Sequence, residues 1–291
     1  MEILVTGCTG FVGSALVDFL LERGHHIHCI SRKDTCHAGA KVNHLQHDLS
    51  KQLNYSILPT TLDCIIHLAA TMERVIKDSD MFLTNTFSTL NLLEYGVTVG
   101  LKKFIFASSG AVYGYSKKPL AETSPVNPMD FYALSKYQSE LLVSHYAQQF
   151  STVILRLFFP YGPGQSSGII PLLANRIMNR EPVTIYNDRH SDGNPKINPI
   201  YITDAIESIG KSLLLEGQYT LNVCGSEVIS VKELSLLIGE CSGLRPIFRY
   251  ANDDKISDLI GDATKMKKCL RIVPTTTVEQ GVRDYLKAHF S

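Results

Sequence analysis

A glycine-rich turn close to residue 1 constrains the fold more than any other feature of the sequence. Gly7, Gly10 and Gly13 follow the apolar run Ile3-Leu4-Val5 and precede an amphipathic stretch. In such a turn the first glycine permits a tight bend, the second lets backbone approach a phosphate, and the third lets helix and strand pack closely. The helix N-terminus then attracts negative charge. The spacing therefore predicts a phosphate-binding turn between a first strand and a first helix.

Strand-like and helix-like segments alternate through the first 160 of the 291 residues. Such alternation implies a parallel sheet covered by helices on both faces. The expected strands are 2–6, 27–31, 42–46, 64–68, 104–108 and 153–158. The expected helices are 11–23, 84–97, 132–149, 170–179, 204–215, 231–241 and 277–288. Segment 188–199 is polar, contains glycine and proline, and is expected to form a long surface loop.

Composition is typical of a globular protein with its own core, with 44% hydrophobic and 19% charged residues. The formal net charge is zero, so a nucleic-acid or acidic-membrane partner is not expected. No run of about 18 apolar residues exists, and Thr6 and Gly7 interrupt the first apolar run before a signal peptide could form. A membrane span is therefore not expected.

The chain contains seven cysteines, an odd number, scattered and without a CxxC motif. This distribution indicates reduced thiols and a cytoplasmic location rather than a disulfide framework. Six of the ten histidines lie between residues 25 and 47. Metal binding is one interpretation of that group, but no spacing repeats a known ligand pattern. A polar, partly exposed strand edge accounts for it better, and no metal is expected.

The end of the second expected strand bears on the choice of cofactor. An acidic residue there would bind the ribose 2′-hydroxyl of NAD. This chain has Ser31-Arg32-Lys33 instead. Arg32 is able to bind a 2′-phosphate through bidentate hydrogen bonds, and Ser31 adds another donor. NADP(H) is therefore favoured. NAD(H) is left open, because Arg32 and Lys33 are also compatible with solvated loop charges.

A hydroxyl and a Tyr/Lys pair follow in an order that supports hydride chemistry. Tyr132 and Lys136 lie four residues apart, on one face of an expected helix. Tyr132 is the candidate general acid, and Lys136 is expected to hold the ribose hydroxyls and depress the pKa of the tyrosine. Ser109 is expected to hydrogen-bond the same substrate oxygen. Strand alternation allows only one of Ser108 and Ser109 to face the site, and Tyr113 is expected to line the pocket.

These motifs resemble the extended short-chain dehydrogenase/reductases, specifically the NAD(P)-dependent epimerase/dehydratase group acting on nucleotide sugars. The resemblance covers nearly the whole chain and weakens after about residue 215. Its motifs are Thr6–Gly13, Asp48-Leu49, His67–Ala70, Asn85, Ser108–Gly114, Tyr132–Lys136, Leu155–Pro163 and Tyr201–Asp204. It implies a Rossmann-type doubly wound parallel sheet with a smaller α/β C-terminal domain.

The resemblance also implies the rest of the cofactor site and the assembly. Asp48 and Leu49 are expected to flank the adenine, residues Leu68, Ala69 and Ala70 to pass along the cofactor, and Pro160 to lie near the nicotinamide. Phe11 and Val12 belong to the phosphate-binding turn. Residues 1–160, joined by 196–217, are expected to bind the dinucleotide, and 161–195 with 218–291 the substrate. Family members commonly dimerise through helices equivalent to 84–98 and 131–149, so a homodimer is expected.

Departures from the family pattern narrow the activity. Phe159 stands where nucleotide-sugar enzymes usually carry an asparagine that contacts substrate. Gly110-Ala111 lacks both the Asp-Glu pair of 4,6-dehydratases and the cysteine of C3/C5 epimerases. Asn198-Pro199-Ile200 replaces the usual Arg-Asp-Phe. Dehydration and C3/C5 epimerisation are therefore disfavoured, and the nucleotide of the substrate is left open.

The favoured activity is NADPH-dependent reduction of a keto-sugar nucleotide, at a 4-keto group. The alternative is an NAD-dependent nucleotide-sugar 4-epimerase, which uses the same Ser109, Tyr132 and Lys136 but retains its cofactor. Two further alternatives are a reductase of a small non-sugar carbonyl, favoured by Phe159, and a non-catalytic NADP-binding regulator. The regulator is disfavoured because all three catalytic positions are kept.

Overall fold

The structure is a computed structural model that describes residues 1–32, 42–72, 76–187, 195–252 and 257–290. These residues form two compact units. The first unit contains Met1–Val112, Asn127–Arg156 and Ile206–Leu221. The second contains Tyr113–Val126, Leu157–Ala205 and Asn222–Ser291.

A seven-stranded sheet, counted over the described residues, forms the centre of the first unit, with strand order β3-β2-β1-β4-β5-β6-β9. Its strands are β1 (Glu2–Thr6), β2 (His26–Ser31), β3 (Val42–Gln46), β4 (Cys64–His67), β5 (Lys103–Ser109), β6 (Ser151–Leu157) and β9 (Gln218–Val223). The β3–β2, β2–β1, β1–β4 and β4–β5 pairs are parallel. Strand order reverses between β1 and β4, and ligands of open parallel sheets bind at the carboxyl ends beside such a reversal.

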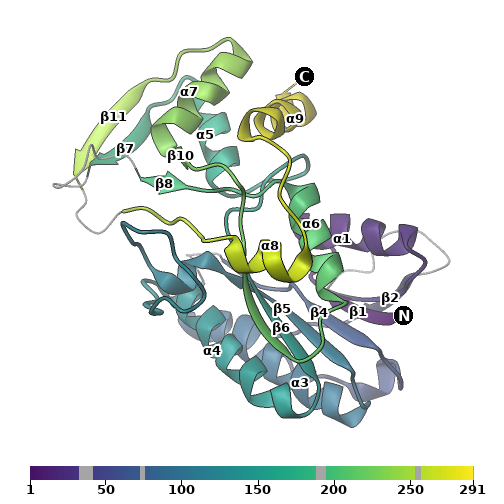
Figure 1. Cartoon of the computed structure of the whole chain (residues 1–291). Helices are drawn as coiled ribbons and strands as arrows, with labels where there is room; N and C mark the ends of the chain where they lie inside the picture. The colour runs from purple at the N-terminus through teal and green to yellow at the C-terminus, as the bar shows by residue number, and fades with distance from the viewer. Residues whose placement is uncertain (33–41, 73–75, 188–194, 253–256, 291) are drawn as a thin grey trace. The chain divides into compact units, whose positions relative to one another are not determined.

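Helices cover both faces of this sheet (Figure 1). Helices α3 (Ser88–Thr98) and α4 (Phe131–His145) lie on one face, and α1 (Phe11–Glu22) and α6 (Ile202–Ser212) on the other. Gly210 of α6 lies so close to α1 that a Cβ there would be 2.3 Å from the Phe19 ring. The predicted doubly wound, Rossmann-type parallel sheet is thereby confirmed.

One apolar core of the first unit lies between the sheet and the α3–α4 layer. Leu4, Ile65 and Phe104 from three neighbouring strands pack there against Leu92 and Leu93 of α3, all of them fully buried. Because both faces of the sheet are covered, the central strands are buried along their length, as for the four-residue run of β4.

The second unit combines helices with two small sheets. Strand β7 (Val183–Asn187) pairs in parallel with β11 (Phe248–Asn252), and β8 (Lys196–Ile197) pairs antiparallel with β10 (Ile229–Ser230). Its helices are α5 (Ile169–Met178), α7 (Val231–Ser242), α8 (Thr264–Leu270) and α9 (Val278–Phe290). An apolar cluster that includes Leu173 of α5, Leu234 of α7 and Val282 of α9 joins these elements.

Several elements differ from their predicted extents. The helix expected over 84–97 begins earlier, as α2 (Asp78–Phe82), and passes through a π-helical turn (Leu83–Phe87) into α3. Strands β7, β9 and β11 were not predicted. The second half of the expected loop 188–199 contains the short strand β8. Its first half, 188–194, lies outside the described residues. Within the described part of the chain, no helix is long and apolar enough to span a membrane.

Candidate active site

The glycine-rich turn joins β1 to α1 in the first unit. Gly7 has a φ of 72°, and a Cβ there would lie 2.7 Å from the Ala69 amide nitrogen. A Cβ on Gly13 would lie 2.0 Å from the carbonyl oxygen of Gly7, so only glycine lets α1 approach the turn this closely. Gly10 is the N-cap of α1 and contributes no side-chain cap, and the first turn carries no acidic residue. These features fit the pyrophosphate of a dinucleotide at the positive end of α1.

The end of β2 lies beside the end of β3. Ser31 is buried and Arg32 is exposed, and the carbonyl oxygen of Arg32 accepts a hydrogen bond of 3.1 Å from Gln46 Nε2. The Asp48 carboxylate accepts from the Ser50 backbone at 3.0 Å and from the Ser50 hydroxyl at 2.9 Å. These hydrogen bonds lower the pKa of Asp48, and the charge of Arg32 lowers it further. A cationic Arg32 therefore stands near an ionised Asp48.

The loop after β4 rises from the core to the surface. Leu68 and Ala69 are half-buried and Ala70 is exposed. Asn85, in the π-helical turn, binds both backbone polar groups of Thr71, the residue after Ala70. Its Oδ1 accepts from the Thr71 amide at 2.8 Å, and its Nδ2 donates to the Thr71 carbonyl at 3.0 Å. The π turn thereby fixes the backbone that follows Ala70.

His67 is fully buried between the ends of β1, β4 and α3. Thr6 Oγ1 accepts from the Ala69 amide at 3.2 Å and lies 2.6 Å from His67 Nδ1, so the hydroxyl donates to that nitrogen. The Nε2–H group then donates to Thr89 Oγ1 at 3.1 Å, and Thr89 donates to the Asn85 carbonyl at 2.7 Å. Burial, and then the charge of Lys136, lowers the pKa of His67 to about 3. A neutral His67 therefore locks the β1 and β4 ends together beneath the glycine-rich turn.

Helix α4 carries the candidate catalytic pair. Asp130 is its N-cap and accepts from the Ala133 amide at 2.8 Å, which begins the helix at Phe131. Tyr132 therefore lies in the first turn, and its phenol is hydrogen-bonded to the Ser109 hydroxyl at the end of β5. Ser108 points instead to Glu140. The structure thus brings Ser109, not Ser108, to Tyr132.

Lys136 lies one turn beyond Tyr132 and is buried, with 3% of its surface exposed. Its ammonium donates to the Ala107 carbonyl at 2.6 Å and lies 4.7 Å from the centre of the Phe106 ring. Burial lowers the pKa of Lys136 to about 7, although the Glu140 carboxylate raises it. Protonation of Lys136 is therefore sensitive to pH near neutrality.

The pKa of Tyr132 is raised to about 12, because burial disfavours the phenolate. The Ser109 hydrogen bond lowers this pKa and the Asp130 charge raises it. From the sequence, Lys136 was expected to lower the pKa of Tyr132, but it is not among the groups that shift this pKa. Tyr132 is therefore a protonated phenol at neutral pH, able to donate its proton.

Sequence reasoning missed the partners of Ser108. Glu140 of α4 accepts from the Ser108 hydroxyl at 2.5 Å, and Arg156 of β6 binds both oxygens of the same carboxylate. Glu140 stands four residues after Lys136, so the spacing that singled out the Tyr/Lys pair also extends to it.

Three predicted site residues belong to the second unit. Tyr113 is 3% exposed, and its hydroxyl donates to Asn222 Oδ1 at 2.8 Å. Phe159 is half-buried and takes a φ of 47°, a left-handed conformation that is uncommon for an aromatic residue. Pro160 is half-buried, and its carbonyl accepts from Gln165 Nε2 at 3.0 Å.

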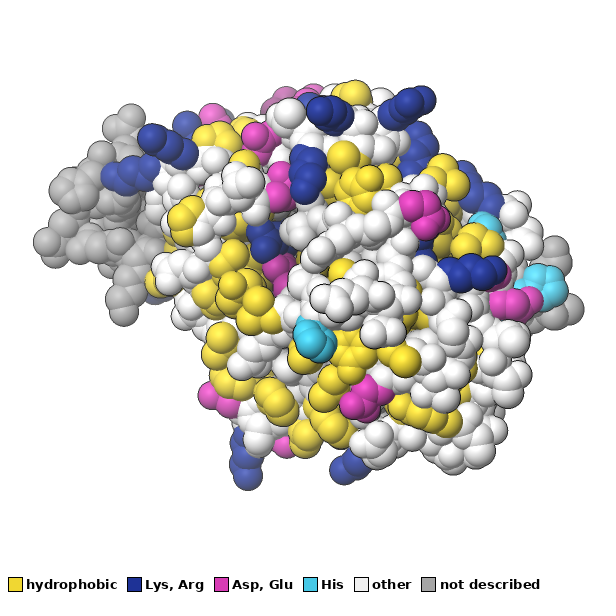
Figure 2. All heavy atoms as spheres, turned by 60° about the horizontal axis from the view of Figure 1, so that its bottom comes forward, with side chains coloured by type: hydrophobic (Ala, Val, Ile, Leu, Met, Phe, Trp, Pro, Cys, Tyr) yellow, Lys and Arg dark blue, Asp and Glu magenta, His cyan; other side chains and the backbone are white. Residues whose placement is uncertain are grey.

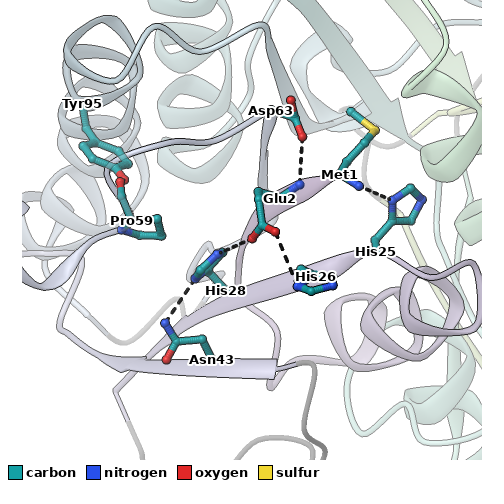
Figure 3. A network of polar contacts seen from close by, with 9 residues as sticks. All are labelled: Met1, Glu2, His25, His26, His28, Asn43, Pro59, Asp63 and Tyr95. Atoms are coloured by element: carbon teal, nitrogen blue, oxygen red, sulfur yellow. Dashed lines mark hydrogen bonds and ion pairs between the residues drawn. The ribbon is translucent and has the colours of Figure 1, made fainter.

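The histidines of β2 lie around Glu2 of the neighbouring strand β1 (Figure 3). Its carboxylate lies 3.0 Å from His28 Nε2 and 3.5 Å from His26 Nδ1, while Asn43 Nδ2 donates to His28 Nδ1 at 3.2 Å. No group of three metal-ligating side chains occurs among the residues that the structure describes. His26 and His28 therefore bind protein groups, Glu2 and, for His28, also Asn43.

Comparison with known proteins identifies the family. The model of the NAD dependent epimerase/dehydratase family matches residues 3–222. The chain belongs to this family. It is accordingly an NAD(P)-dependent enzyme of the extended short-chain dehydrogenase/reductase type, as predicted, and several relatives are named as nucleotide-sugar enzymes.

Two relatives and one solved structure illustrate the range of the family. The chain is 30% identical to an uncharacterised UDP-glucose epimerase of Bacillus subtilis, with 97% of this chain and 96% of the relative covered. It is also 30% identical to dTDP-4-dehydro-6-deoxyglucose reductase of Escherichia coli, with 98% and 96% covered. The solved structure of MoeE5 with UDP-glucuronic acid and NAD is 26% identical and has a TM-score of 0.88, with 99% and 98% covered.

Proposed function

We propose that this enzyme uses NADPH to reduce the keto group of a keto-sugar nucleotide, at C4 of the sugar. The observation that carries the proposal is the end of β2, where Ser31 and the exposed Arg32 stand in place of an acidic residue. A guanidinium group binds a 2′-phosphate with bidentate hydrogen bonds, whereas a carboxylate would repel it. A reductase exchanges its cofactor in every turnover, and NADPH is the reductant suited to that use.

The first unit offers the surfaces that would hold the dinucleotide. The glycine-rich turn from Gly7 to Gly13 would bind the pyrophosphate, with Phe11 and Val12 contributing to the positive end of α1. Further along the cofactor, we assign adenine contacts to Asp48 and Leu49, and contacts with the remainder to Leu68–Ala70. Pro160 belongs to the second unit, and its contact with the nicotinamide is a separate proposal. The roles of Tyr113 and Phe159 in binding substrate are likewise proposals.

NADPH would supply the hydride that adds to the keto carbon. Tyr132 donates its proton to the substrate oxygen, and Ser109 hydrogen-bonds that oxygen as charge develops on it. Lys136 stabilises the phenolate that remains, because an ammonium group one turn away favours the charged form. Support for this direction comes from the raised pKa of Tyr132, which leaves the phenol protonated and ready to act as an acid.

A 4-epimerase is the second candidate, and the Bacillus subtilis relative named a UDP-glucose epimerase favours it. Such an enzyme would first remove the proton from the C4 hydroxyl and later return it, using the same Ser109, Tyr132 and Lys136. It would retain NAD, so the reaction would show no net redox change. The E. coli reductase is an equally similar relative.

One assay separates the two candidates. Purified protein is mixed with dTDP-4-dehydro-6-deoxyglucose and NADPH, and in parallel with UDP-glucose alone. The proposal predicts NADPH consumption with a reduced sugar nucleotide as product, and no reaction of UDP-glucose. Conversion of UDP-glucose into its 4-epimer without added cofactor would establish the epimerase instead. NADPH consumption only with small aldehydes or ketones would point to a non-sugar substrate.

We also propose a homodimer that forms through α3 and α4. Figure 2 shows apolar side chains gathered on the face that lies at the bottom of Figure 1, where these helices are. Val97 of α3 and Leu134 and Leu141 of α4 are among the exposed apolar residues. Sedimentation equilibrium tests the proposal, which requires twice the chain mass and is contradicted by a monomer.

The proposed location is the cytoplasm. None of the six described cysteines forms a disulfide, and four of them are buried. Such thiols are typical of a reducing compartment. Localisation by fluorescent fusion tests this, and an extracytoplasmic signal would contradict it.

A further inference from the structure

Glu140 is a buried carboxylate directly behind the candidate catalytic pair. Only 4% of its surface is exposed, and Arg156, its ion-pair partner, is 5% exposed. Arg156 Nε donates to Glu140 Oε1 at 2.9 Å and Arg156 Nη2 donates to Oε2 at 2.6 Å. Burying such a pair costs desolvation that is often not recovered as stability. Its presence so close to Lys136 therefore calls for an explanation beyond packing.

Helix α4 holds the end of β5 through three residues spaced by single turns. Tyr132 contacts Ser109, Lys136 contacts the Ala107 carbonyl, and Glu140 contacts Ser108. Side chains alternate between faces along a strand. Turning Ser108 to Glu140 therefore turns Ser109 the other way, toward Tyr132. The carboxylate thus contributes to the orientation of the serine that the proposed reaction uses.

Glu140 is also the nearby anion that acts on Lys136. From the same helix Tyr132 faces this region as a neutral phenol, and from β4 comes His67, which is neutral. Strand β5 presents the Ala107 carbonyl and the Phe106 ring, both uncharged. From β6, Arg156 is the second buried cation, and it neutralises Glu140. The Glu140 carboxylate therefore forms an ion pair with Arg156 and also acts electrostatically on Lys136.

We propose that Glu140 is a positioning residue that favours the protonated form of Lys136, and that Arg156 limits its effect by pairing with the same carboxylate. The inference deepens the proposed function, because it assigns Glu140 to the catalytic role proposed for Lys136. Burial alone works against the ammonium of Lys136, and the pKa of about 7 already includes the raising effect of Glu140. Without the carboxylate, the pKa of Lys136 is expected to fall, so a larger fraction of Lys136 is neutral and Tyr132 loses a neighbouring positive charge.

The ionisation of Lys136 is measurable directly, without cofactor or substrate. Protein labelled with ¹⁵N-lysine is titrated by NMR of the Nζ signals, and the Lys136 signal is assigned by its absence in Lys136→Arg. In Glu140→Gln the pKa of Lys136 is expected to fall by about one unit, a tenfold weaker hold on the proton. In Arg156→Gln the pKa of Lys136 is expected to rise, because the negative charge of Glu140 is then no longer offset by the charge of Arg156. Glu94→Gln, which removes an exposed carboxylate of α3, is the matched control and leaves this pKa in place.

Opposite shifts in the two variants are the signature of the electrostatic role. A structural role alone predicts no shift, or shifts in one direction, and either result overturns the proposal. If Glu140→Gln does not fold, Glu140→Asp and Arg156→Gln decide the question, since the first retains the charge and the second removes its competitor.

Activity supplies a second readout. Loss of the Lys136 proton ends activity as pH rises, so the alkaline limb of the kcat/KM profile moves to lower pH in Glu140→Gln and returns in Glu140→Asp. An unmoved alkaline limb overturns the proposal. Failure of the wild type to reduce any carbonyl refutes the proposed function instead, and the Nζ titration still decides the role of Glu140.

Discussion

Two adjacent serines have opposite environments at the end of β5. Ser108 is 3% exposed and contacts Glu140, whereas Ser109 is half-buried and contacts Tyr132. From the sequence, strand alternation limits the site to one of the two. Choosing between them with certainty requires knowing which face of β5 meets α4, because that depends on tertiary packing. The roles of Gly7 and Gly13 in the turn follow more directly from their spacing, since any side chain there would collide with backbone.

The Tyr132→Phe substitution tests the proposed general acid. It removes the proton donor and keeps the ring, so kcat is expected to fall by about a hundredfold or more, with the affinity for NADPH nearly unchanged. Tyr137→Phe, on the same helix, is the control and is expected to retain activity. Steady-state kinetics and calorimetric cofactor titration measure the two quantities. Full activity of Tyr132→Phe would remove this residue from the mechanism.

Element ends follow local signals closely where a cap or glycine is present. The Asp130 cap begins α4, and the glycine-rich turn begins α1. Strands β7 and β11 were missed because each finds its partner far along the chain, and pairing rather than propensity stabilises such strands. The π-helical turn from Leu83 to Phe87 was missed because apolar periodicity barely changes across one wider turn.

The end of α5 offers a prediction at the scale of a single element. Arg180 directly follows the C-cap residue Asn179 and has a φ of 57°, a left-handed conformation that favours glycine. Arg180→Gly is expected to raise the free energy of unfolding by about 1 kcal/mol. Gly243→Ala at the end of α7, with a φ of 70° and open space around it, is expected to lower it by about the same amount. Urea unfolding measures both, and equal stability of the two variants would contradict this assignment of strain.

At the scale of the whole molecule, the alternation of strands and helices was sufficient to predict the doubly wound sheet of the first unit. The second unit was less predictable, because its two small sheets join segments that lie far apart in sequence. The assignment of cofactor and substrate binding to separate domains stays a prediction. The network around His67 was also not foreseen, since its members come from β1, β4 and α3 and share no sequence spacing.

The neutral state of His67 predicts that the molecule loses stability in mild acid. Its pKa falls from 6.5 to about 3 on folding, so the unfolded chain binds more protons within this window. Stability is therefore expected to decline as pH falls below 6.5, by up to about 1.4 kcal/mol per pH unit for this proton. The carboxyl groups that hold lowered pKa values, such as Glu233 with an ordinary value of 4.5, add their loss only at lower pH.

Urea unfolding between pH 4.5 and 6.5 checks the acid sensitivity. His67→Asn is expected to be less stable overall but to show a flatter dependence on pH. His145→Gln, at the exposed end of α4, is the control and is expected to keep the slope of the wild type. An unchanged slope in His67→Asn would show that another group takes up the proton.

Titration of cofactor-free protein with NADPH and with NADH tests the central claim most directly. The account predicts at least about tenfold tighter binding of NADPH, a difference that a single bidentate phosphate contact accounts for. It also predicts that Arg32→Ala abolishes the difference. Equal or tighter binding of NADH, or protein that purifies with NAD bound, would contradict the assignment of Arg32 and place the 4-epimerase first.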